Sequence, residues 1–143
     1  MHFTWLDTKD IKEFKSVLID VQENYRKIAE EFCKYYYTNY DSNFMELKDI
    51  YSDNSCFTYL DEEIIGFNSL VSKLGIMNIH KFDHKSINVN AQPVGKTSLL
   101  ILTTGTISVN NSIHVNKFSE SILLQRNNDN KFVVYNTIFK LTE

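Results

Sequence analysis

The sequence has few of the residues that interrupt or cross-link a chain, with four glycines, one proline and two cysteines among 143 residues. Because the glycines do not cluster, no glycine-rich phosphate loop exists, and we expect no nucleotide bound in that way. Cys33 and Cys56 stand among aromatic residues and not in a C-x-x-C pair. We therefore expect two buried, reduced thiols.

The sequence also lacks long apolar runs and an excess of positive charge. No run approaches the ~18 apolar residues that span a bilayer, and the start MHFTWLDTKD has neither the basic head nor the apolar stretch of a secretory signal. The formal net charge is -3 and the 15 basic residues are scattered, whereas phosphate binding needs clustered Lys and Arg. We expect an intracellular protein that contacts neither a membrane nor nucleic acid directly.

The composition is that of a globular domain, with 43% hydrophobic and 23% charged residues. The length suits one core, and no linker, internal repeat or low-complexity tract divides the chain. We expect a single domain over residues 1–143, of which 1–24 form an N-terminal helical extension.

Residues 8–37 carry apolar side chains at alternating spacings of three and four, which predicts one long amphipathic helix or two abutting ones. Asp7 or Thr8 can cap its start. A coiled coil is the competing interpretation, but the pattern stops before Asp41 and no second heptad region exists to pair with it. The apolar positions are Ile11, Phe14, Leu18, Val21, Tyr25, Ile28, Phe32 and Tyr35.

Shorter elements follow this helix. The spacing predicts helices over 44–51 and 67–74, the second stopped by Gly75. Between them, residues 55–60 and the pair at 64–65 are expected to form a hairpin around a polar break. Four further strands, separated by turn-rich segments, are predicted at 84–92, 98–109, 117–126 and 131–140. Helices first and strands afterwards favour an α+β domain whose antiparallel sheet curls around the helices.

Two of these strands are apolar on both faces. Alternation places Phe132, Val134, Asn136, Ile138 and Lys140 opposite Val133, Tyr135, Thr137 and Phe139, and places Leu99, Ile101 and Ile107 opposite Leu100 and Leu102. The helices of so short a chain cover one face only. A second domain of the same shape is the simplest cover for the other face.

Several fragments, taken together, resemble the nuclear transport factor 2 family. They are AEEFCKYYYTNYD (29–41), ELKDIYSDNSCFTY (46–59), Gly66, KFDH (81–84), NVNAQP (88–93), Gly105, KFSESILL (117–124) and YNTIFKL (135–141). They occur in the family's order and at its spacing, from about Tyr25 to Leu141. The resemblance implies a cone-shaped α+β fold, with N-terminal helices packed in a curved antiparallel sheet, a hydrophobic cavity in the cone, and pairing through the open sheet face.

The resemblance includes two transport branches. In the homodimeric nuclear transport factor 2, an aromatic residue followed by an acid, and two acids on a later loop, grip the GDP-bound small GTPase Ran. The corresponding positions here are Tyr59 with Leu60, and Asn110 with Ser112. Tyr59 keeps an aromatic ring at the first position, but the three carboxylates are absent. The basic residues of Ran would therefore lose their charge partners. We therefore do not expect Ran binding.

The other branch is the small subunit of the messenger RNA export receptor, which pairs with a related domain on a larger chain. Its longer opening helix resembles the N-terminal stretch here, which favours this branch, although KFDH, NVNAQP and YNTIFKL are at least as close to the first. The resemblance places a basic residue at Lys140 in the dimer interface, and lysine is a weaker bidentate partner than the usual arginine; the alternative is an exposed lysine at a strand end. The expected interface residues are Leu102, Asn136, Ile138 and Lys140.

The same fold also hosts enzymes such as ketosteroid isomerase and scytalone dehydratase. Possible proton-transfer groups here are Tyr36, Tyr40, Asp41, His84 and Glu120. No two of them stand at a diagnostic spacing, so we expect no enzyme and no cofactor. The histidines His2, His80, His84 and His114 lack the cysteine or carboxylate that completes a ligand set, so we expect no metal.

Together these observations predict a nucleocytoplasmic transport factor that acts as a protein-binding module. The preferred hypothesis is the small export-receptor subunit. The alternatives are a homodimeric carrier of GDP-bound Ran and a small cone-fold isomerase or dehydratase. The family implies a location in nucleus and cytoplasm and at the nuclear pore, where Phe-Gly repeats of nucleoporins are possible partners.

Overall fold

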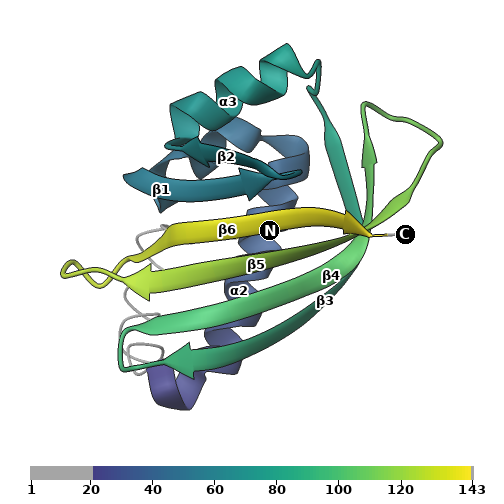
Figure 1. The fold of residues 1–143 in the computed structure, drawn as a ribbon. Helices are drawn as coiled ribbons and strands as arrows, with labels where there is room; N and C mark the ends of the chain where they lie inside the picture. Colours follow the sequence, from purple (N-terminus) through teal and green to yellow (C-terminus); the bar gives the residue numbers. More distant parts are fainter. Residues whose placement is uncertain (1–20, 143) are drawn as a thin grey trace.

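The structure is a computed structural model that describes residues 21–142 (Figure 1). In chain order its elements are α2 (Val21–Ser42), the 3-10 helix η1 (Phe44–Ile50), β1 (Tyr51–Tyr59), β2 (Glu62–Ile65), α3 (Phe67–Ile76), β3 (Phe82–Val94), β4 (Ser98–Val109), β5 (Asn116–Arg126) and β6 (Phe132–Thr142). Helices precede the four long strands, as expected for an α+β domain.

The six strands form one curved sheet in the order β2-β1-β6-β5-β4-β3. Neighbouring strands are antiparallel except β1 and β6, which run parallel, so the sheet is mixed. Figure 1 shows α2 crossing behind the long strands and α3 lying beyond the β2–β1 edge. The sheet therefore has an inner face, packed on α2, and an outer face, turned toward the viewer.

The long helix continues past its expected end at residue 37, because the buried stripe extends to Asn39 and Tyr40. The chain leaves the helix at Asn43, whose φ is -156°. The Asn43 amide still donates to the Asn39 carbonyl at 2.8 Å, which closes the last turn. The predicted helical residues 8–20, with the Asp7 or Thr8 cap, lie outside the described residues, as does most of the expected extension over 1–24.

Gly75 does not stop α3, contrary to the sequence prediction. It lies inside the helix, and a Cβ built there meets no atom within 4 Å. The helix ends only after Ile76, where the Met77 amide donates to the Lys73 carbonyl at 3.0 Å. Asn78, with a φ of 61°, supplies the left-handed residue that turns the chain toward β3.

Strict alternation along β6 is also wrong. The pairing with β5 shifts between Leu123 and Leu124, which face Asn136 and Val134. Tyr135 is therefore an extra residue, as in a β-bulge, and the inward and outward positions exchange beyond it. The residues buried on the inner face are Phe132, Val134, Thr137 and Phe139, and the outward ones include Asn136, Ile138 and Lys140.

Glycine is required at position 105 for a steric reason. A Cβ there would lie 2.7 Å from the Lys85 carbonyl oxygen and 3.0 Å from the Phe118 ring. The crowding occurs where β3 has a register shift between Lys85 and Asn88. Gly105 thus lets a distorted edge strand pack closely on β4.

Candidate protein-binding site

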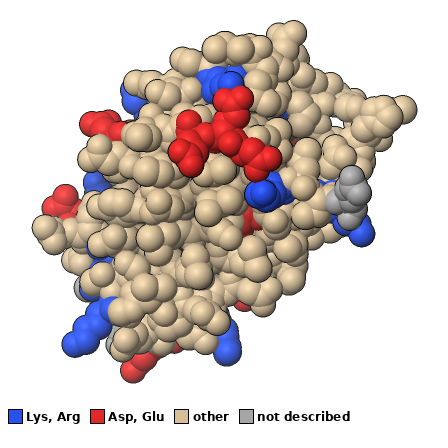
Figure 2. Space-filling model, viewed as in Figure 1, with Lys and Arg blue, Asp and Glu red and all other residues tan. Residues whose placement is uncertain are grey.

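The outer face carries a continuous apolar strip that no element among residues 21–142 covers. Leu102 on β4 lies opposite Ser121 on β5, which lies opposite Ile138 on β6. Leu102 and Ile138 are 45% and 49% exposed. Figure 2 shows that this side of the molecule is broadly free of charged side chains across the middle strands.

A second row runs beside the first. It consists of Leu100, Leu123, Asn136 and Cys56, which lie opposite one another in turn across β4, β5, β6 and β1. Leu100 is 44% exposed, whereas its chain neighbour Leu99 is fully buried on the inner face. Leu102, Asn136 and Ile138 of the expected interface therefore share one exposed surface, which we call the outer strip, together with Leu100, Leu123 and Cys56.

Cys56 is exposed, so the expectation of two buried thiols is wrong for this residue. Its aromatic neighbours Phe57 and Tyr59 are buried on the inner face, and Cys56 points the other way because side chains alternate along a strand. Cys33, on α2, is buried, and both thiols are free. Burial raises the pKa of the Cys33 thiol well above its usual range.

Lys140 lies on the outer face at the edge of the strip. Its ammonium is 3.2 Å from the Asp61 carboxylate in the β1–β2 turn, and both side chains are exposed. Asp61, Glu62 and Glu63 are all exposed, and Figure 2 shows acidic side chains gathered over this turn. An exposed ion pair of this kind contributes little to stability, so Lys140 remains available to another carboxylate.

The four positions that resemble a Ran site lie at two loops. Tyr59 is buried and stacks on Phe139 with ring centroids 4.9 Å apart, while Leu60 occupies the turn with a φ of 51°. Ser112 lies in the β4–β5 loop, where its hydroxyl accepts the His114 amide at 3.0 Å.

Asn110 holds two segments together. Its side-chain oxygen accepts the backbone amides of His80 and Lys81 at 2.9 and 3.2 Å, and its Nδ2 donates to the Asn78 carbonyl at 2.7 Å. The side-chain amide of Asn110 is thus hydrogen-bonded to the segment that leads into β3. A partner would have to break these bonds to use it.

The interior contains a buried polar network centred on Glu120 of β5. The Tyr37 hydroxyl lies 2.7 Å from Glu120 Oε1 and 2.5 Å from Thr103 Oγ1. The Tyr36 hydroxyl donates to Glu120 Oε2 at 3.4 Å and accepts from the Tyr51 hydroxyl at 3.0 Å. Among the expected proton-transfer residues, the structure therefore brings Tyr36 and Glu120 together.

The Glu120 network lies in the buried interior. Every member is buried, and Glu120 itself is 3% exposed. Desolvation raises the pKa of Glu120 to about 7, although hydrogen bonds from Tyr37 and Tyr36 and the nearby His84 act in the opposite direction. Burial also raises the pKa of Tyr36 and Tyr37 well above the usual range. The network has donors and a carboxyl group suited to proton transfer; of its members Tyr37 lines a surface pocket, whereas Glu120 does not line that pocket.

Asp41 and His84, two more of the candidates, form a clamp between the end of α2 and β3. Asp41 Oδ1 lies 2.6 Å from His84 Nδ1, and Asp41 Oδ2 accepts the His84 amide at 2.9 Å. The pair borders a surface pocket of about 330 Å³, yet the His84 side chain is almost completely enclosed. Both carboxylate oxygens are used locally, which favours a structural role.

The remaining histidines do not join a cluster. His80 precedes β3, His114 lies in the β4–β5 loop, and His2 lies outside the described residues. Within residues 21–142 no group of three or more His, Cys, Asp or Glu side chains is placed to hold a metal ion. None of the described helices is both long and apolar enough to cross a bilayer.

The sequence reasoning missed Tyr37, Tyr51 and Thr103 as members of the Glu120 network. The pattern offers a partial signal, because a glutamate at an inward position of a strand needs buried donors. It does not say which of the adjacent tyrosines reach it. Which tyrosines reach Glu120 depends on how α2 crosses β4 and β5, and local spacing in the sequence does not predict this crossing.

The fold and the two faces define a class: an α+β cone with a closed polar interior and an exposed apolar sheet face. The sequence profile of the Nuclear transport factor 2 (NTF2) domain matches residues 28–141. The chain is 30% identical over 115 residues to nuclear transport factor 2B of Arabidopsis thaliana, covering 80% of this chain and 91% of the relative. It is 29% identical over 118 residues to nuclear transport factor 2 of Neurospora crassa, covering 82% and 95%. The chain belongs to the nuclear transport factor 2 domain family.

Solved structures agree on the fold. Nuclear transport factor 2 from Cryptosporidium parvum superposes with a TM-score of 0.74 at 23% identity, over 83% of this chain and 95% of that one. A chain of the Candida albicans Mtr2-Mex67 M domain complex gives 0.64 at 12% identity, over 81% and 93%. A ketosteroid isomerase-like protein from Erwinia carotovora atroseptica gives 0.68 at 13% identity, over 82% and 95%. The fold is therefore shared by binding proteins and by relatives of enzymes.

Proposed function

We propose that this chain is a nucleocytoplasmic transport factor that works as a protein-binding module and pairs through the outer strip. The observation that carries the proposal is the exposed apolar surface formed by Leu102 and Ile138 with their neighbours on β4, β5, β6 and β1. Contiguous exposed apolar patches mark interaction sites on soluble proteins. Asn136 and Lys140, at the centre and edge, supply the polar contacts of such an interface.

The partner in this interface is a second domain of the same shape. The sequence favoured a larger export-receptor chain, but the relatives named nuclear transport factor 2 at 29–30% identity favour a second copy of this chain. We therefore propose a homodimer, with the export-receptor subunit as the alternative.

The proposed dimer acts between cytoplasm and nucleus without the Ran interaction. Leu60, Asn110 and Ser112 lack carboxylates, and the Asn110 side chain is committed to the start of β3. Nucleoporin Phe-Gly repeats remain the candidate contact at the nuclear pore.

Catalysis is the second candidate function, and the Glu120–Tyr37 hydrogen bond of 2.7 Å is the observation that favours it. Both residues are buried, however, and an enzyme must bring substrate to its acid or base. We propose a binding module because Glu120, the group best suited to proton transfer, is buried and does not line the surface pocket that Tyr37 borders.

A permeabilised-cell assay tests this function. Fluorescently labelled full-length protein is added to digitonin-permeabilised cells, and its accumulation at the nuclear rim is imaged. We expect a bright rim with wild type and a much weaker one with Ile138→Glu, because pairing multiplies contacts with repeated sequences in the pore. Ile113→Glu, the same change in the β4–β5 loop, should leave the rim intact. Absence of rim staining with folded wild type would contradict the proposal.

A further inference from the structure

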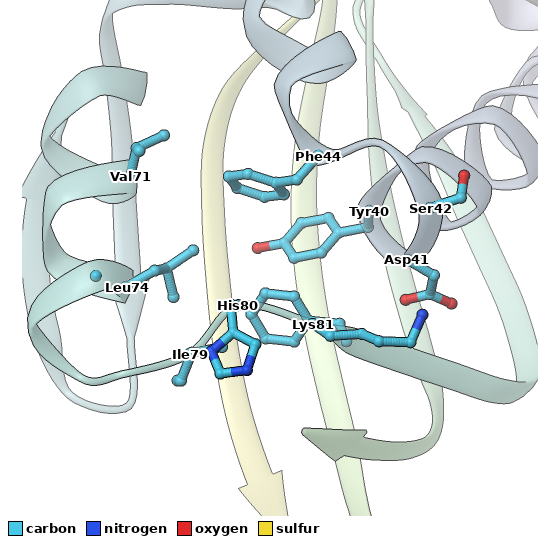
Figure 3. A pocket seen from close by; sticks show the side chains of 11 residues that line it. Tyr40, Asp41, Ser42, Phe44, Val71, Leu74, Ile79, His80 and Lys81 are labelled. Atoms are coloured by element: carbon cyan, nitrogen blue, oxygen red, sulfur yellow. The ribbon is translucent and has the colours of Figure 1, made fainter. Parts of the chain in front are cut away.

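A pocket at the end of α2 is lined mainly by apolar side chains. It has a volume of about 300 Å³ and lies between α2, α3 and the segment that leads into β3. In Figure 3 the side chains of Val71 and Leu74 on α3 point toward Phe44 and Tyr40 across this space, with Ile79 and His80 at its lower side. The Glu120 network and the outer strip contribute no residue to this lining.

The Tyr40 hydroxyl is aimed into the pocket, and no hydrogen bond to it occurs within residues 21–142. Tyr40 is only 7% exposed. No fully enclosed side-chain oxygen or nitrogen in the described part of the chain lacks a partner, so the free hydroxyl must reach the open space of the pocket. A phenol that is buried in this way usually has a partner.

The Tyr40 ring is fixed, so the direction of its hydroxyl is fixed with it. It packs edge-on against Phe44, Phe82 and His84 with centroids 4.8, 5.0 and 5.2 Å away. Burial holds the pKa of Tyr40 well above its usual range, so the group is a neutral donor at physiological pH.

The mouth of the pocket is also held in place. Asn110 Oδ1 accepts the amides of His80 and Lys81, and Asp41 at the rim is bound to His84. Neither element has to move to create the space. A largely preformed, mainly apolar cavity with a few convergent polar groups is the usual form of a small-molecule site.

We propose that this pocket binds a compact, uncharged aromatic or alicyclic molecule whose single acceptor oxygen, such as a ketone, accepts a hydrogen bond from Tyr40. The volume of about 300 Å³ equals that of about ten water molecules at ~30 Å³ each, so the ligand must be small. Of the charged lining residues, Asp41 is already paired with His84 and Lys81 is exposed, so a charged ligand would find no free buried charge to pair with it. This site is independent of the proposed pairing surface.

Two probes of the same size and shape test the proposal on the full chain. Acetophenone carries the carbonyl oxygen, and α-methylstyrene replaces it with a CH₂ group. Each is titrated into isotope-labelled protein, and the methyl resonances of Val71, Leu74 and Ile79 are followed by NMR. We expect saturable shifts with acetophenone, at a dissociation constant on the order of 1 mM for so small a ligand, and weaker binding of α-methylstyrene.

Variants separate the contribution of the Tyr40 hydrogen bond to binding from that of the apolar walls. Tyr40→Phe keeps the ring packing and should weaken acetophenone about fivefold, the value of one hydrogen bond, while α-methylstyrene binds as before. Tyr35→Phe, on the same helix but outside the pocket, should change neither probe. Val71→Phe should fill the space and abolish both; if it does not fold, Tyr40→Phe decides. Equal acetophenone affinity in wild type and Tyr40→Phe, or shifts that do not saturate at these methyl groups, would overturn the proposal.

Discussion

The inner and outer faces of this sheet both carry apolar residues, but those of the inner face are buried and those of the outer face are exposed. On β4, Leu99 and Ile101 are fully buried under α2, while Leu100 and Leu102, one residue away, are nearly half exposed. On β6, Phe139 stacks on Phe118 and Tyr59, while its neighbour Ile138 faces outward. The chain completes its own core on one face and, in the proposed dimer, needs a second domain to complete the other.

The largest expected effect comes from a charge on the outer strip. Ile138→Glu would bury an unpaired carboxylate on pairing, and should weaken the dimer by roughly 10²- to 10³-fold. Sedimentation velocity on both proteins at matched concentration measures this change, with circular dichroism as the test of folding. Ile113→Glu introduces the same charge at a loop residue that is 92% exposed, and should leave pairing unchanged. A paired Ile138→Glu would remove the outer strip from the interface.

Adjacent leucines on β4 compare the two faces directly. Leu99→Ala leaves a cavity in a packed core and should lower the free energy of unfolding by about 2–5 kcal/mol. Leu100→Ala should lower it by less than about 1 kcal/mol. Urea unfolding should be measured in the Ile138→Glu background, so that pairing does not contribute to stability. Equal losses at the two positions would mean that the outer face is packed within the single chain.

The Glu120 network makes the inner face sensitive to pH. The pKa of Glu120 is about 7 in the folded protein, above its ordinary 4.5, so the folded state binds the proton more tightly. The contribution to stability is complete below pH 4.5 and is lost as pH rises through 7, with a total of about 3 kcal/mol. Glu120→Gln should therefore match wild type near pH 4.5 and become more stable by pH 8. Parallel stability curves for the two proteins would show that Glu120 does not titrate in this window.

The last prediction is that this chain does not bind GDP-bound Ran. Because Leu60, Asn110 and Ser112 stand where the family resemblance implies Ran-binding acids, each lost ion pair costs about 2–5 kcal/mol. Isothermal calorimetry with GDP-bound Ran at micromolar concentration should give no binding heat. A micromolar complex would mean that the exposed Asp61 and Glu62 act in place of the missing carboxylates, and would restore the Ran-carrier alternative.

Local patterns predicted much of the fold. The order of the elements, the bounds of β4 and the opposition of Leu99 to Leu100 follow from periodicity and turn residues alone. The tertiary features did not follow. The bulge at Tyr135 depends on pairing with β5, and Gly75, which lies inside α3, shows that a glycine in a helical pattern does not always stop the helix.

The two faces differed in how much the sequence revealed about them. Alternation grouped Asn136 with Ile138 on β6 and Leu100 with Leu102 on β4, and the bulge preserves the first grouping. That the two groups share the outer face was expected from the family resemblance and not from alternation. The Glu120 network joins residues more than 80 positions apart, so no spacing along the chain predicts it. The exposed Cys56 was missed because its aromatic neighbours were assumed to share its environment.

The central claim is that the outer face is completed by a second domain, and light scattering on the wild-type chain tests it most directly. The mass should be measured from low micromolar concentration upward, on the purified full-length protein alone. We predict twice the chain mass of 16.8 kDa, with dissociation only on dilution. A soluble monomer of 16.8 kDa at the highest concentration would contradict the proposed homodimer and return Lys140 to an ordinary lysine at the end of a strand.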